Sequence, residues 1–82
     1  MPKLYVLKVE EFAGLIESAR TKPGCTVIDT PGPYAVIESA GPITFARREI
    51  GAGPAVWYSA FSGGFEGRLV DFGREEVTLV DP

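Results

Sequence analysis

Candidate nucleophiles are scarce in this chain of 82 residues, which contains no histidine and one cysteine. Cys25 would need a neighbouring base or a positive environment to become a reactive thiolate, and Lys22 is the nearest cation in sequence. Ser59 and Ser62 lack the Gly-x-Ser-x-Gly context of an activated serine. We therefore interpret Cys25 as a small buried residue at the start of a strand, and we predict no catalytic residues.

Carboxylates are the second group of side chains that could do chemistry. Five of them lie near expected turns or strand ends: Asp29, Glu38, Glu49, Glu66 and Asp71. Two carboxylates with separated pKa values can act as general acid and base, and carboxylate oxygens can bind Mg²⁺ or Ca²⁺. However, the spacing matches no EF-hand loop, and 23% charged residues is ordinary for a solvated surface. With one thiol and no imidazole, a zinc or iron–sulfur site is also not expected, so we predict no metal and no cofactor.

A glycine-rich loop, Gly-Ala-Gly-Pro at residues 51–54, precedes a possible helix. Backbone N–H groups at such a position can bind an anion. Pro54 removes one of those donors, and no lysine follows at the spacing of a phosphate-binding loop. We interpret the loop as a connection, in which the glycines end one element and Pro54 begins the next.

The last candidate is the aromatic segment GAGPAVWYSAFSGGFEG, residues 51–67, which contains the only tryptophan. Tryptophan, tyrosine and arginine are the residue types enriched in protein interfaces, and two arginines lie just upstream. Three uses stay open, namely core filling, a protein interface and a pocket for a small apolar ligand. Helical spacing would place Trp57 and Phe61 on one side and Tyr58 near Ser62 on another, so that one side faces the core. The predicted binding residues are Arg47, Arg48, Trp57, Tyr58 and Phe61.

The first elements that must position these residues are a strand and a helix. Residues 4–9 alternate as a strand, and both of its faces are largely apolar, which favours a place inside a sheet. Apolar residues at positions 12, 15, 16 and 19 then form the stripe of an amphipathic helix over 10–21. Gly14 weakens this helix by roughly 1 kcal/mol relative to alanine, and Lys-Pro-Gly at 22–24 ends it.

Two hairpins are expected after the helix. Residues 26–29 and 34–38 form the first, and Pro31-Gly32 predicts a type II turn with a left-handed glycine between them. Residues 67–72 and 76–80 form the second, with a charged, solvent-facing tip.

The middle of the chain allows two interpretations. Residues 43–50 could be a strand, or a short helix with Gly51 at its end. For residues 54–62 we favour a short helix, because Pro54 and Gly63-Gly64 stand where a helix begins and ends, although the residues between them are strand-prone. The expected fold is α+β: a small, mainly antiparallel sheet of about five strands, one packed amphipathic helix and a short second helical segment.

Size and charge limit the function classes. Residues 1–82 make a single domain, which buries only roughly 60% of its unfolded surface, and one cysteine allows no internal disulfide. The net charge is −3 without a basic cluster, which argues against nucleic acid, and the longest apolar run cannot span a membrane. The acidic N-terminal region argues against a secretion signal. We expect a cytoplasmic protein, and the small size favours a bacterial source.

Two functions follow as hypotheses. The first is a non-catalytic accessory or interaction protein that self-associates or binds a larger enzyme through the aromatic and arginine residues. The second is a small-molecule enzyme or binder at a subunit interface, with Glu38 or Glu66 as general acid or base in a pocket lined by Trp57.

Overall fold

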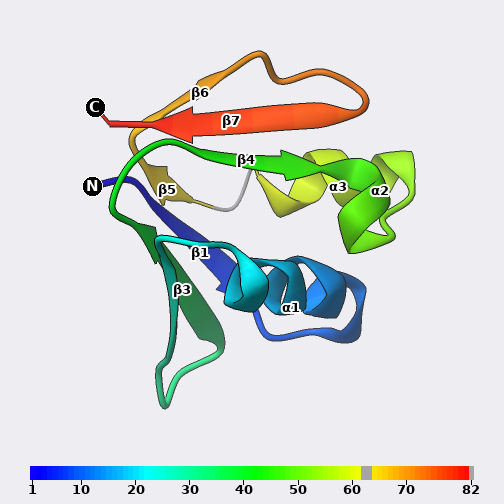
Figure 1. Cartoon of the computed structure of the whole chain (residues 1–82). Coiled ribbons are helices and arrows are strands. Elements are labelled where there is room, and N and C mark those ends of the chain that lie inside the picture. The colour runs from blue at the N-terminus through cyan, green and yellow to red at the C-terminus, as the bar shows by residue number, and fades with distance from the viewer. Residues whose placement is uncertain (62–63, 82) are drawn as a thin grey trace.

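Two antiparallel sheets and several short helices surround one apolar core in the computed structural model, which describes residues 1–61 and 64–81 (Figure 1). The α+β class is therefore confirmed. The expected single sheet of about five strands is wrong in detail, because the described residues form seven strands in two sheets. The division depends on pairing between distant segments, which local alternation does not encode.

The first sheet, sheet A, has the strand order β2-β3-β1-β5. Its strands are β1 (Lys3–Leu7), β2 (Cys25–Asp29), β3 (Tyr34–Ser39) and β5 (Phe65–Glu66). The strand expected at 4–9 and the first expected hairpin are both present. Leu4 and Val6 of the inner strand β1 are buried, so the even-numbered side of β1 faces the core.

The predicted helix over 10–21 begins as a 3₁₀ turn, η1 (Glu10–Phe12), and continues as α1 (Ala13–Thr21). Leu15 and Ala19 of its apolar stripe are buried in the core. Gly14 is not simply a weak point of the helix. A Cβ there would lie 2.1 Å from the carbonyl oxygen of Ile50, so the missing side chain lets α1 and α2 (Arg47–Ile50) approach closely.

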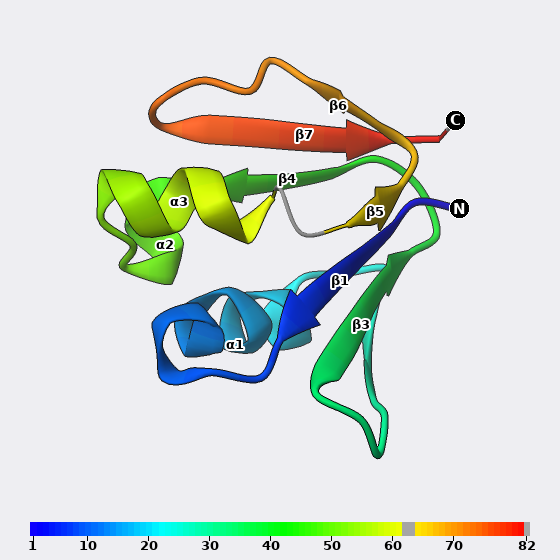
Figure 2. The same cartoon turned by 180° about the vertical axis from the view of Figure 1, so that it is seen from behind.

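The turn of the first hairpin differs from the prediction. Gly32 does not adopt the left-handed φ of a type II turn. The reason is local, since Pro33 follows it and disfavours helical conformations in the preceding residue. Residues 30–33 instead form a wider loop, in which the Thr30 hydroxyl donates to the Tyr34 carbonyl at 2.5 Å. In two opposite views the β2–β3 hairpin projects away from the body of the protein (Figures 1 and 2).

The second sheet, sheet B, has the order β4-β7-β6, with β4 (Ile43–Ala46), β6 (Arg68–Val70) and β7 (Glu76–Val80). The predicted closing hairpin is confirmed as β6 and β7.

Both interpretations of residues 43–50 hold in part, because the strand β4 passes directly into α2, which Gly51 ends at φ 67°. The favoured helix over 54–62 is confirmed as α3 (Pro54–Ala60), with Pro54 at its first turn. The expected positions of Ser62 and Gly63 lie outside the described residues.

The core forms where α1–α3 and the inner sides of both sheets meet. Trp57, Phe45 and Phe61 are its largest fully buried side chains. The accessible surface is 4688 Å². A folded monomer of this mass exposes about 4,800 Å². The accessible surface of the chain is therefore typical of a folded monomer of its mass.

Candidate functional site

Trp57 and Phe61 do not lie on the surface. Trp57 is 0% exposed, and its indole Nε1 donates to the Gly73 carbonyl at 2.8 Å. Its ring meets that of Phe61 edge-on at 5.0 Å between centroids, and Phe61 is also buried. Of the three uses left open for the aromatic segment, core filling fits the burial of these two residues, and their role in binding stays a prediction. The i, i+4 spacing on α3 puts both on the side that faces sheet B, so they fill the core.

Arg47 is occupied inside the molecule. Its Nε donates to the Arg74 carbonyl at 3.0 Å, and its two terminal nitrogens donate to the Ala52 carbonyl at 3.1 Å and to Glu75 Oε1 at 2.9 Å. The guanidinium beside it holds the pKa of Glu75 below its usual range. Arg47 therefore joins the α2–α3 connection to the β6–β7 loop. A planar, five-donor group suits such a role better than lysine would.

Arg48 and Tyr58 are the predicted binding residues that do reach solvent. Arg48 is exposed, and the Tyr58 ring is 44% exposed. Tyr58 packs against Phe72 at 5.4 Å between centroids. Phe72 in turn contacts Trp57 edge-on at 6.1 Å. The pair is thus the outer rim of the core rather than a separate patch.

Cys25 begins β2, as predicted, and is partly buried against the core. Burial raises the pKa of its thiol, against the smaller opposing effects of Ser39 and Lys22. A thiol of this kind is protonated at neutral pH and is a poor nucleophile.

The outer side of sheet A, which we name the open face, has apolar residues where solvent-facing strands usually carry polar ones. Cross-strand register places Tyr5 opposite Val36 and Leu7 opposite Tyr34, while Ile28 of β2 lies beside Val36. Ile28 is 43% exposed, Tyr34 38% and Leu7 37%. The open face comprises Lys3, Tyr5, Leu7, Thr26, Ile28, Tyr34, Val36, Glu38 and Glu66.

The corresponding side of sheet B is different. At its centre Thr44 faces Thr78, and their hydroxyls lie 2.8 Å apart. Polar β-branched residues of this kind are ordinary for a solvated strand face. Val70 lies opposite Thr78 on this side and Val80 lies opposite Arg68, so this side of sheet B mixes polar and half-buried apolar residues.

A shallow hollow of about 350 Å³ lies on the open face, lined by Tyr5, Thr30, Tyr34 and Val36. The two tyrosines are diagonal neighbours across β1 and β3, and Val36 lies opposite Tyr5. Two amphipathic rings beside a small aliphatic residue suit an apolar side chain or a planar small molecule.

One end of the open face is polar. Lys3 Nζ lies 3.5 Å from Glu38 Oε2 and 4.0 Å from Glu66 Oε2. The Tyr5 hydroxyl donates to Glu66 Oε2 at 2.5 Å, and this bond raises the pKa of Tyr5. The structure thus brings together the two acids of the enzyme hypothesis. They meet a lysine and a tyrosine, however, and not Trp57, which is buried in the core.

The other predicted carboxylates do not join them. Asp29 pairs with Arg20 at 3.3 Å, and Glu49 pairs with Lys22 at 3.4 Å. Asp71 adopts a left-handed φ of 52° at the exposed end of β6. Among residues 1–61 and 64–81, no three or more Cys, Asp or Glu side chains converge as a metal site would require.

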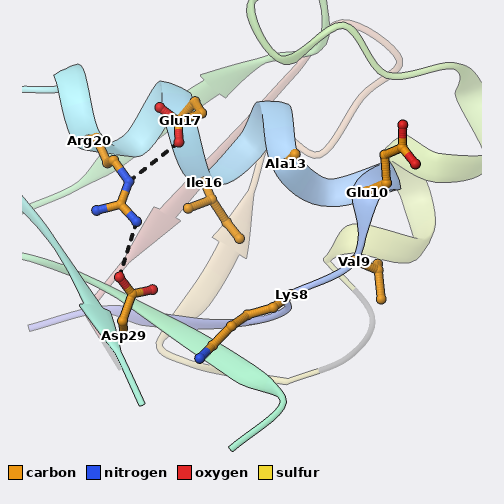
Figure 3. A pocket seen from close by; sticks show the side chains of 8 residues that line it. All are labelled: Lys8, Val9, Glu10, Ala13, Ile16, Glu17, Arg20 and Asp29. Carbon is orange, nitrogen blue, oxygen red and sulfur yellow. Dashed lines mark hydrogen bonds and ion pairs between the residues drawn. The ribbon is translucent and has the colours of Figure 1, made fainter. Parts of the chain in front are cut away.

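A second hollow of about 340 Å³ lies between η1, α1 and the ends of β1 and β2 (Figure 3). Ile16 is part of its lining, and Arg20 lies between Glu17 at 3.5 Å and Asp29 at 3.3 Å. Lys8 donates to the Thr30 carbonyl. Both cations on the rim therefore already have oxygen partners, so this hollow offers little charge to a ligand.

In the described part of the chain, no helix is both long and apolar enough to cross a membrane. A scan against models of known protein families finds no match, and a comparison with curated proteins finds no relative.

The sequence contained the signal for the open face. Both faces of residues 4–9 are largely apolar, which predicts a strand inside a sheet. Sheet A has helix packing on one side only, so Tyr5 and Leu7 remain accessible.

Proposed function

We propose that this chain is a small non-enzymatic interaction protein whose contact surface is the open face of sheet A. The observation that carries the proposal is the group of exposed apolar side chains at Leu7, Ile28 and Tyr34. Contiguous apolar surface bordered by polar residues marks interaction sites on soluble proteins. The polar end formed by Lys3, Glu38 and Glu66 supplies the charged rim.

The chemistry of the surface fits a protein partner. Tyrosine gives large contact area at low conformational cost, and Tyr5 and Tyr34 flank a hollow that an apolar side chain can enter. The short β2–β3 hairpin extends this face beyond the body of the protein (Figure 1). Self-association or binding to a larger enzyme would both bury these residues.

Tyrosine footprinting tests this proposal directly, because the chain has three tyrosines and two of them lie on the open face. The protein would be oxidised by hydroxyl radicals in three samples: dilute and pure, concentrated and pure, and in concentrated lysate of its host. We expect Tyr5 and Tyr34 to be protected in at least one of the last two samples, while Tyr58 on α3 reacts equally in all three. Equal reaction of Tyr34 in all three samples, or protection of Tyr58 alone, would contradict the proposal.

A second candidate is a small-molecule binder, supported by the hollow between Tyr5 and Tyr34 with Glu66 at its edge. A planar compound with a hydrogen-bond donor would fit this lining. Titration with phenol or indole, followed by the ring proton shifts of Tyr5 and Tyr34, tests it. Saturable shifts that Tyr34→Ala removes would favour this candidate, whereas no shift at millimolar ligand would exclude it. Trp57 fluorescence is not a suitable reporter, because the indole is buried away from the hollow.

A further inference from the structure

The open face is arranged in rows across the strands, with charge at one end and apolar residues at the other. The first row is Thr26, Glu38, Lys3 and Glu66. The second is Ile28, Val36 and Tyr5, and the third is Tyr34 and Leu7. The two central strands carry opposite charges in the first row, since Lys3 on β1 lies directly opposite Glu38 on β3.

We infer that the partner on the open face is a second copy of this chain, packed face to face about a two-fold axis that runs parallel to the strands between β1 and β3. This inference rests on the proposed function and names its partner. Such an axis keeps every row opposite the same row but exchanges β1 with β3. Lys3 then faces the partner's Glu38, and Glu38 faces the partner's Lys3.

The apolar rows match under the same operation. Tyr5 faces the partner's Val36, and Leu7 faces the partner's Tyr34, so each large ring meets an aliphatic side chain. Two sheets packed this way keep their strands within roughly 30° of each other, about 10 Å apart. One operation thus satisfies both charge and shape, as an isologous interface requires.

The other aligned two-fold arrangement is unfavourable. An axis perpendicular to the strands would lay the charged first row over the partner's third row. Lys3 and Glu38 would then lose water against Leu7 and Tyr34, and burying charge against apolar groups is costly. Charge complementarity therefore selects the axis parallel to the strands.

The size of the open face sets the strength of the contact. Three strands of five or six residues and the two-residue strand β5 cover a flat footprint of less than roughly 300 Å². Stable complexes bury roughly 800 Å² of accessible surface on each partner. We therefore expect a weak, concentration-dependent dimer, in agreement with a chain whose surface area is already that of a folded monomer.

Charge-reversed variants mixed with each other test the inference, because mixing separates contacts between copies from the Lys3–Glu38 pair within one copy. In Lys3→Glu alone, and in Glu38→Lys alone, both two-fold contacts become like-charged. When the two variants are mixed, each contact between unlike copies joins a lysine to a glutamate. Sedimentation equilibrium at up to roughly 1 mM protein would measure association of the wild type, each variant and the mixture.

We expect the dissociation constant of each variant alone to rise about tenfold, since two surface charge pairs of ordinary strength reverse sign. The mixture should return to within about threefold of the wild type. The matched control is Arg20→Glu mixed with Asp29→Lys, an ion pair of similar length on the helix side of sheet A. That mixture should associate no better than its components. Circular dichroism melting checks that every variant is folded.

Three results would overturn the inference: a wild type that is monomeric at roughly 1 mM, variants that associate as the wild type does, or a mixture no stronger than its components. The proposed function fails on a different result, namely a tyrosine footprint in which Tyr34 reacts equally in every sample. If Tyr34 is protected in lysate while the pure chain stays monomeric, the open face is used but its partner is another protein.

Discussion

The aromatic segment on α3 and the open face of sheet A show opposite relations between residue type and exposure. Trp57 and Phe61 belong to the residue types that dominate interfaces, yet they are sealed in the core. Leu7, Ile28 and Tyr34 look like ordinary strand residues, yet they form the exposed apolar surface. Residue type alone therefore does not predict whether a side chain is exposed. Exposure depends on the side of the helix or strand on which the residue lies.

The difference has a simple geometric origin. On α3, residues four apart share a side, and that side packs on sheet B. On β1, successive residues point to opposite sides, so only one of its two apolar sides can face α1. An apolar residue on the second side stays exposed unless another layer covers it.

The largest expected effect separates the two regions by stability. Trp57→Ala should lower the free energy of unfolding by about 3–5 kcal/mol, because it leaves a large cavity and an unpaired Gly73 carbonyl. Tyr34→Ala on the open face should cost less than about 1 kcal/mol. Urea denaturation of dilute protein measures both. Equal costs would remove the distinction between core and surface aromatic residues.

Two glycines allow the same comparison at the backbone. Gly14→Ala gains helix propensity, but its Cβ would meet the Ile50 carbonyl oxygen at 2.1 Å, so we expect a loss of about 1–3 kcal/mol. Gly32→Ala, at the tip of the β2–β3 hairpin, meets only the Thr30 hydroxyl at 3.8 Å and should be nearly neutral. Thermal melts of both variants provide the measurement. A more stable Gly14→Ala would show that α1 and α2 can separate freely.

The adjacent arginines should also differ. Arg47→Ala removes donors to Ala52, Arg74 and Glu75 and should cost roughly 1–2 kcal/mol. Arg48→Ala, at an exposed position, should change stability by less than about 0.5 kcal/mol. Neither change should affect self-association, because both residues lie away from the open face. Loss of the dimer in Arg48→Ala at unchanged stability would instead support the interface predicted from sequence.

The smallest expected effect concerns pH. The hydrogen bond from Arg47 holds the pKa of Glu75 below its ordinary value of 4.5. A carboxylate whose pKa is lowered by folding stabilises the protein above 4.5, and this contribution disappears as the pH falls through the lowered value. The stability difference between wild type and Glu75→Gln should therefore be constant near neutral pH and shrink below pH 4.5. A difference that grows on acidification would contradict this assignment.

Local patterns in the sequence predicted most elements but not their assembly. The stripe at Phe12, Leu15 and Ala19 sufficed for α1, and Pro54 sufficed for the start of α3. The partition into two sheets was missed, because the register that joins β4 to β7 links residues thirty or more positions apart. The structural reason for Gly14 is likewise non-local, since it depends on the approach of Ile50.

The candidate site was predicted less well for the same reason. The enzyme hypothesis predicted a role for Glu38 and Glu66, and both carboxylates do lie near the ammonium group of Lys3. It could not place them beside Tyr5, because β5 pairs with β1 across about sixty residues of chain. Which apolar side of β1 would stay uncovered was equally a matter of tertiary packing.

Methyl NMR on dilution tests the central claim most directly, namely that the open face and not the α3 segment makes the contact. Spectra of the pure chain would be recorded from roughly 1 mM down to about 10 μM. We predict that the methyl signals of Leu7, Ile28 and Val36 move together along one binding curve, while those of Val56 and Leu69 stay fixed. Shifts confined to Val56 and Leu69, or none at any concentration, would contradict the account.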